Sequence, residues 1–142
     1  LFRSYHGRVI DHFYTTNAVE HARANGYTKE GTVGYLGRDG STESHCSCLR
    51  PLFRLYHHRA RNHFYTSKAT ERASAEGFGY KFESIEGYCT SEPACGAYLP
   101  LYRFYSASGQ NHFYTTSVDE MKKVKSNLKQ YKYEGIECYL WQ

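Results

Sequence analysis

The sequence predicts a mainly β protein with short helices, in which three internal repeats are arranged around a pseudo-threefold axis. The phrase His-Phe-Tyr-Thr occurs three times, at His12–Thr15, His63–Thr66 and His112–Thr115. Each copy begins eleven residues after the start of a second shared phrase, Leu-Phe/Tyr-Arg-x-Tyr. A fixed offset repeated three times indicates internal triplication. Aromatic residues make up 17% of the chain, with 15 Tyr and 8 Phe, and such a composition favours strands.

Each repeat begins with a predicted β-hairpin. The first strands start at Leu1, Leu52 and Leu101. Their period of two puts Leu, Arg and Tyr on one face and the residues between them on the other. After a short polar turn, the His-Phe-Tyr-Thr phrase forms the second strand.

A short helix and a final aromatic phrase complete each repeat. The helices are expected over Ala18–Ala24, Ala69–Ala75 and Val118–Leu128. Asn17 and Ser117 are placed to cap the first and third helices, and Ser67 is the candidate cap of the second. The final phrases cover Tyr27–Leu36, Tyr80–Cys89 and Tyr131–Leu140. A small residue after glutamate in each phrase predicts a bend or a β-bulge that splits the phrase into two strands.

The three repeats form one domain. They span residues 1–37, 52–90 and 101–142, and connectors that contain cysteine join them. Units of this size are too small to bury a core alone, so they must pack around a common axis. A β-trefoil-like barrel is the expected arrangement, and a propeller-like ring of three small sheets is the alternative.

The cysteines indicate an oxidising compartment. There are five, Cys46, Cys48, Cys89, Cys95 and Cys138, and their spacing does not match a zinc site. Disulfides are the expected use. Several pairings are open, and the odd cysteine is either a free thiol or a link to a second copy in a homodimer.

The other composition features agree with a secreted, extracellular protein. The chain begins at Leu1 without Met, as a secreted protein does after its leader has been removed. No stretch approaches the ~20 apolar residues of a membrane span. The net charge of +4 is mild, and the lysines at 122–132 are interpreted as a solvated helix face rather than a nucleic-acid site.

The repeated phrases resemble a known family. Leu-Tyr-Arg-Phe-Tyr, Asn-His-Phe-Tyr-Thr-Thr and Tyr-Glu-Gly-Ile-x-Cys-Tyr are similar to the HFYT-repeat family, over nearly the whole chain apart from the two connectors. That family is a secreted repeat of unknown function, often attached in bacteria to wall- or glycan-degrading enzymes. The resemblance implies an extracellular, lectin-like accessory module without catalytic activity, and it supplies no site residues.

The repeated polar and aromatic residues are candidate glycan ligands. A sugar site pairs an aromatic face with an acid or amide that accepts hydrogen bonds from hydroxyl groups. The repeats offer such groups as Asp11, His12 and Tyr14, as Asn62, His63 and Tyr65, and as Asn111, His112 and Tyr114. Three weak sites on one rigid body gain avidity on a multivalent glycan surface.

Two other interpretations of these residues stay open. In the structural one, Phe13, Phe64 and Phe113 fill the core while His and Tyr hydrogen-bond across the hairpin. In the other, the three histidines meet on the axis as a metal site, which only the symmetry supports, so no metal or other cofactor is expected. Arginine and glutamate are repeated as well, as Arg3, Arg54 and Arg103 and as Glu20, Glu71 and Glu120. We expect them to pair and brace a strand against a helix, with contact to an acidic sugar as the alternative.

Catalysis has little support. An active site is normally unique, whereas each histidine of the repeated phrase has two equivalents, and no nucleotide-binding motif is present. The sequence therefore predicts a multivalent carbohydrate-binding protein, not an enzyme, with glycans or glycoproteins as partners. A structural, extracellular-matrix or defence protein without sugar specificity is the alternative.

Overall fold

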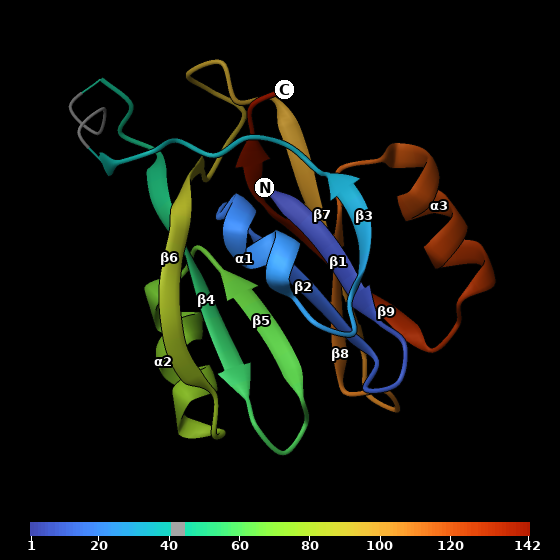
Figure 1. Ribbon diagram of the computed structural model, residues 1–142. Helices are drawn as coiled ribbons and strands as arrows, with labels where there is room; N and C mark the ends of the chain where they lie inside the picture. Colours follow the sequence, from blue (N-terminus) through green and yellow to red (C-terminus); the bar gives the residue numbers. More distant parts are fainter. Residues whose placement is uncertain (41–44) are drawn as a thin grey trace.

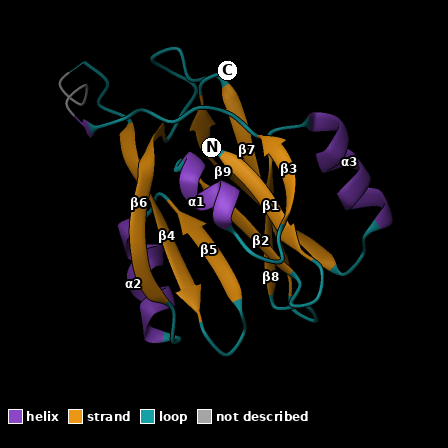
Figure 2. Cartoon of the chain, in the orientation of Figure 1, coloured by secondary structure: helices purple, strands orange, loops and turns teal. Residues whose placement is uncertain are grey.

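The computed structural model describes residues 1–40 and 45–142, and within them the fold is mainly β with three short helices, as Figure 1 and Figure 2 show. This confirms the predicted class. The elements are β1 (Phe2–His6), β2 (Asp11–Thr15), α1 (Ala18–Arg23), β3 (Thr28–Thr32), β4 (Leu49–His57), β5 (Asn62–Thr66), α2 (Ala69–Gly77), β6 (Lys81–Thr90), β7 (Leu99–Ser106), β8 (Asn111–Thr115), α3 (Val118–Asn127) and β9 (Tyr131–Leu140). We call β1–β3 with α1 unit 1, β4–β6 with α2 unit 2, and β7–β9 with α3 unit 3.

In each unit the first strand lies between the other two. Unit 1 forms a separate sheet of order β2-β1-β3, and units 2 and 3 share a sheet of order β5-β4-β6-β9-β7-β8. The two halves of the larger sheet are joined by a single bridge between Thr90 and Tyr139. Figure 1 shows α2 and α3 on opposite flanks of the molecule.

The predicted hairpins are confirmed, with the same register in all three units. Phe2 pairs with Thr15 in unit 1, and the corresponding first pair is Phe53 with Thr66 in unit 2 and Tyr102 with Thr115 in unit 3. The third strand of each unit then returns antiparallel to the first strand.

The expected irregularity in the final strand is a β-bulge centred on glutamate, but it does not split β6 or β9 into two strands. In unit 2 the pairing steps from Leu52↔Gly87 to Phe53↔Ile85, which leaves Glu86 without a partner in β4. The residue passed over in this way is glutamate at every such step: Glu30 in unit 1, Glu83 and Glu86 in unit 2, and Glu134 and Glu137 in unit 3. A bulge changes the direction of the side chain that it adds, and here it frees a carboxylate for other contacts.

Two of the three predicted helix caps are confirmed. The Asn17 and Ser117 side chains accept hydrogen bonds from backbone N–H groups in the first turns of α1 and α3. The N-cap position of α2 is Lys68, which makes no side-chain cap. Ser67 is not the cap, because its hydroxyl donates to the carboxylate of Glu137 at 2.8 Å.

The edge strands β2, β5 and β8 meet at the centre, where each contacts the other two. The Tyr65 hydroxyl accepts a hydrogen bond from the Tyr14 amide at 2.7 Å and donates to the Tyr14 carbonyl at 2.6 Å. Tyr114 binds the Tyr65 backbone in the same way, and Tyr14 binds that of Tyr114. These hydrogen bonds close a ring, and the aromatic rings lie edge to face with centroids 5.3 to 5.5 Å apart. We call this arrangement the tyrosine ring.

Apolar side chains surround the tyrosine ring. The leucine that begins each repeated phrase is buried beside it, as is the disulfide between Cys89 and Cys138, which links β6 to β9. The phenylalanines of the repeated phrase are buried as predicted, with 5 to 6% of their surface exposed: Phe13, Phe64 and Phe113.

Removing a hydroxyl from the tyrosine ring should destabilise the fold. Tyr65→Phe or Tyr114→Phe removes the side-chain partner of a buried amide N–H and of a buried carbonyl, at a cost of about 1–3 kcal/mol. Tyr14→Phe does the same for the Tyr114 amide, but the Tyr114 carbonyl keeps a hydrogen bond from Arg3 at 3.3 Å, so its loss should lie at the lower end of that range. Urea unfolding measures the loss. Tyr98→Phe is the control, because Tyr98 is 67% exposed, and its effect should stay within about 0.5 kcal/mol. Unchanged midpoints for all three ring variants would contradict the role given to these hydroxyls.

Candidate functional site

The nine residues predicted as glycan ligands lie together, but as an internal network. Asp11, Asn62 and Asn111 have no exposed surface. Each side chain crosses to a neighbouring unit and accepts a backbone N–H. The bonds run from the His63 amide to Asp11 at 2.9 Å, from the His112 amide to Asn62 at 3.0 Å, and from the His12 amide to Asn111 at 3.2 Å. The oxygen atoms that a sugar hydroxyl would approach are therefore occupied.

The tyrosines of the predicted site are equally enclosed. Tyr14, Tyr65 and Tyr114 are each 1% exposed, and their hydroxyls bind backbone within the tyrosine ring. A sugar stacks on a free aromatic face, and these three rings offer none. Of the predicted residues only the histidines approach the surface, and His12 is the most open of them.

One junction between units has an acid where the other two have an amide. The Nδ1 atom of His63 lies 2.6 Å from a carboxylate oxygen of Asp11. The other two histidines have amide nitrogens as neighbours, with His12 2.9 Å from Asn111 and His112 2.8 Å from Asn62.

This difference separates the pKa values of the three histidines. Burial, with the charge of the arginine in the same repeat, lowers the pKa of His12 to about 4 and that of His112 to about 3. Burial also acts to lower the pKa of His63, but the carboxylates of Asp11 and Glu83 outweigh it and the pKa is raised. Relative to an ordinary histidine, the cationic form is thus stabilised at one junction and destabilised at the other two.

A buried arginine lies at each junction. Its guanidinium forms two hydrogen bonds with the carboxylate of a helix glutamate, in the pairs Arg3–Glu120, Arg54–Glu20 and Arg103–Glu71. It also lies 5.1 to 5.4 Å from the ring centre of a phenylalanine in the unit that supplies the helix. The predicted bracing of strand against helix is confirmed, and the strand and the helix belong to different units.

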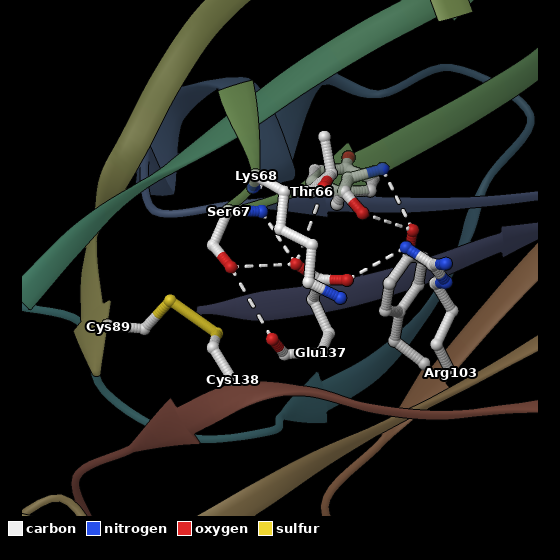
Figure 3. Close-up of a disulfide and its surroundings, with 9 residues drawn as sticks. Thr66, Ser67, Lys68, Cys89, Arg103, Glu137 and Cys138 are labelled. Atoms are coloured by element: carbon white, nitrogen blue, oxygen red, sulfur yellow. Dashed lines mark hydrogen bonds and ion pairs between the residues drawn. A yellow bond between two sulfur atoms is a disulfide. The ribbon is translucent and has the colours of Figure 1, made fainter. Parts of the chain in front are cut away.

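Units 2 and 3 add a second bulge glutamate to this cluster. The Glu137 carboxylate lies 2.8 Å from Arg103 and accepts hydrogen bonds from the amide and hydroxyl of Ser67 at 2.6 and 2.8 Å, as Figure 3 shows beside the Cys89–Cys138 disulfide. Glu86 plays the same part beside Arg54, at 2.9 Å. The carboxylate therefore ties a guanidinium to the start of a helix in another unit.

Unit 1 departs from this pattern, because Val33 stands where the other units have Glu86 and Glu137. Among the described residues, Arg3 has ion pairs with Glu30 at 2.9 Å and Glu120 at 2.7 Å. The junction between units 1 and 3 thus has one carboxylate fewer around its arginine than the other two junctions.

A groove of about 680 Å³ opens beside Arg3 at this junction. Its lining combines aromatic and apolar side chains with polar groups from α3 and from the turn before β8. The main members are Arg3, Tyr5, Ile10, His12, Glu30, Ser108, Phe113, Glu120, Lys123, Asn127, Leu128 and Tyr131. We call this cavity the 1/3 groove.

A second groove, of about 330 Å³, lies at the junction of units 2 and 1. It is lined by Phe13, Glu20, Tyr27, Arg54, His63 and Glu83. These residues are the repeat counterparts of Phe113, Glu120, Tyr131, Arg3, His12 and Glu30 in the 1/3 groove. The same surface is therefore built at least twice, from two different pairs of units.

Sequence reasoning missed the helix side chains of the 1/3 groove. Lys123 and Asn127 follow Glu120 at spacings that place all three on one face of α3. That spacing was the available signal, but it did not indicate which neighbouring unit the face would meet.

The three-histidine metal site is not formed. Within the described residues, the group of three or more potential ligand side chains close enough to share an ion is Cys46, Cys48 and Cys95. Each histidine Nδ1 instead contacts a different Asp or Asn side chain.

No helix in the described part of the chain is long and apolar enough to cross a membrane.

One family model matches residues 1–141, and its description is "Domain of unknown function (DUF5648)". The chain belongs to this family. No curated protein and no solved structure matches the chain. The DUF5648 description states no activity, so the function proposed below rests on the geometry of the junctions.

Exchanging the acid and the amide between junctions should exchange the histidine pKa values. Asp11→Asn should bring the pKa of His63 below the ordinary histidine value, because burial then acts unopposed by its nearest carboxylate. Asn111→Asp is the matched converse and should raise the pKa of His12. An NMR titration of the histidine side chains measures both. A His63 pKa that stays raised in Asp11→Asn would contradict this assignment.

The same shifts give stability a pH dependence. His12 and His112 have lowered pKa values, so the unfolded chain binds protons first and stability falls as the pH drops from about 6.5 towards about 3. His63 acts in the opposite sense. Its raised pKa contributes stability that is present below about pH 6.5 and is lost as the pH rises through the folded value. The stability of Asp11→Asn should therefore fall more than that of the wild type as the pH drops. Urea unfolding at pH 7 and at pH 4 measures this, and a midpoint of the variant that is the same at both pH values would contradict it.

Proposed function

We propose that this is a secreted, multivalent carbohydrate-binding protein whose glycan sites are the grooves between its units. We further infer that the units form a pseudo-threefold, propeller-like ring of three three-stranded units rather than a β-trefoil barrel, with the Thr90–Tyr139 bridge merging the sheets of units 2 and 3. The position of the first strand between the other two in every unit supports this, as does the closed tyrosine ring.

The 1/3 groove is the observation that carries the proposal. Its volume of about 680 Å³ falls within the ~300–1,000 Å³ range of small-ligand sites. Tyr5 and Tyr131 are half-buried and offer ring surface to the C–H groups of a sugar. Lys123 and Asn127 are exposed donors beside them.

The carboxylates of the groove suit hydroxyl recognition. Glu30 and Glu120 keep 32% and 36% of their side-chain surface exposed while Arg3 holds them in place. An acceptor that is already fixed loses little conformational entropy when a hydroxyl binds to it. The arginine cluster thus preorganises the groups that would contact the sugar.

The second groove supports multivalent binding. Glu20 and Glu83, its counterparts of Glu120 and Glu30, keep 40% and 34% of their side-chain surface exposed beside Arg54. Weak sites on one rigid body bind a surface that displays many glycans with greater avidity than either site alone. The proposed role is binding without catalysis.

Secretion is supported by the cysteines. Disulfides between Cys46 and Cys95 and between Cys89 and Cys138 fit an oxidising compartment. The rival function, a structural, matrix or defence protein without sugar specificity, fits the same compartment and differs in its ligand.

A glycan array at micromolar protein separates the two functions, and groove variants locate the site. Lys123→Ala and Asn127→Ala should each weaken binding of the best glycan about 2- to 13-fold, since a hydrogen bond contributes about 0.5–1.5 kcal/mol. Titration calorimetry measures the change.

Lys122→Ala is the matched control, because Lys122 lies on the same helix, is exposed and does not line the groove. It should leave affinity unchanged. Equal losses of glycan affinity in Lys122→Ala and Lys123→Ala would place binding elsewhere on α3. An array without any bound glycan would favour the structural function.

A further inference from the structure

Three cysteine sulfurs gather where the two connectors meet. Cys46 and Cys95 form a disulfide, and Cys48 is a free, buried thiol. The Cys48 sulfur lies 3.6 Å from that of Cys46, and all three sulfurs lie within 4.8 Å of one another. Cys95 is exposed, whereas Cys46 and Cys48 are 5% and 7% exposed.

We propose that these residues form a thiol–disulfide exchange site that transfers the free thiol from buried Cys48 to exposed Cys95. The Cys48 thiolate attacks the sulfur of Cys46. The Cys46–Cys48 bond forms as the Cys46–Cys95 bond breaks, and the electron pair leaves on Cys95, which takes up the proton that Cys48 gave up. One disulfide and one thiol are present before and after, so the step requires no oxidant or reductant.

The geometry defines the motion that the step requires. Attack runs along the axis of the disulfide, and a sulfur 3.6 Å beyond Cys46 on that axis would lie more than 4.8 Å from Cys95, because an S–S bond is about 2 Å long. Cys48 therefore rotates about its Cα–Cβ bond before it reacts. One residue separates Cys48 from Cys46, so their bond closes only a small loop.

Contacts other than the disulfide hold the cluster together during exchange. Cys46, Cys48 and Leu49 pack with the partly buried rings of Tyr88 and Trp141. The Trp141 indole N–H also donates to the backbone carbonyl of Cys95 at 3.0 Å, and that bond does not depend on the Cys95 sulfur.

Exchange makes Cys95 a covalent modification site for disulfide compounds. Its thiolate attacks an external disulfide of the glutathione class, forms a mixed disulfide and releases one thiolate, which again conserves electrons. A homodimer linked through the odd cysteine, the alternative to a free thiol, would use the same sulfur, because Cys48 itself is buried. This inference is independent of the proposed glycan binding.

Peptide mapping of the native protein tests the exchange. The folded chain is incubated with glutathione disulfide or iodoacetamide at mildly alkaline pH, quenched in acid and digested with trypsin without reduction. We expect more than half of the label on Cys95. The peptide of residues 39–54, which contains Cys46 and Cys48, should carry an internal disulfide and no cross-link to the Cys95 peptide.

Cys48→Ser distinguishes exchange from incomplete oxidation. This variant has no thiol to start the step, so Cys95 should stay unlabelled. Label on Cys95 in Cys48→Ser, label confined to Cys48 in the wild type, or no label without denaturant would each overturn the proposal.

Discussion

The rest of this structure depends on one constraint. The edge strands β2, β5 and β8 meet at the centre, and none of them has another strand to pair with there. An edge strand presents backbone N–H and C=O groups that must find partners once they are buried. Here the partners are side chains from a neighbouring unit. One tyrosine hydroxyl satisfies both an N–H and a C=O, and an Asp or Asn oxygen satisfies the N–H of the histidine. Each unit supplies what another lacks, which explains why His-Phe-Tyr-Thr recurs unchanged in all three repeats.

The arginine clusters solve a second problem that the same arrangement creates. Bringing units together buries a guanidinium, and a buried charge is costly unless carboxylates and hydrogen bonds surround it. The bulges provide them, because the residue that each bulge adds is glutamate. Beside Arg3, a phenylalanine covers one side of the guanidinium while Glu30 and Glu120 keep part of their surface in solvent. Interactions that join the units therefore also leave fixed acidic groups at the surface of each junction.

Local chemistry in the sequence was enough to predict the hairpins, the helices and most of the caps. The period of two, the side-chain caps of α1 and α3 and the small residue after glutamate all act within a few residues. Side-chain contacts between units could not be predicted, since sequence spacing does not indicate that Arg54 pairs with Glu20 of another repeat. Ser67 shows the same limit, because a carboxylate from unit 3 outcompetes the helix end for its hydroxyl. Six of the nine candidate ligands, the acid, the amides and the tyrosines, are enclosed for a related reason, as repetition marks residues that hold the units together as readily as residues that bind, whereas His12 and His63 line the two grooves.

Repetition and divergence therefore have different meanings in this chain. The tyrosine ring needs three equivalent contributions, and there the repeats are identical. The junction surfaces do not need three equivalent contributions, and there the repeats differ. Val33 replaces a glutamate in unit 1, and Asp11 replaces an asparagine opposite His63. The helix position of Lys123 in the 1/3 groove is Arg23 in α1 and Ser74 in α2. Under the proposed function, these differences give the grooves unequal charge and unequal donors. A ligand that engages more than one groove would then present different groups to each, as a branched or heterogeneous glycan does and a uniform polymer does not.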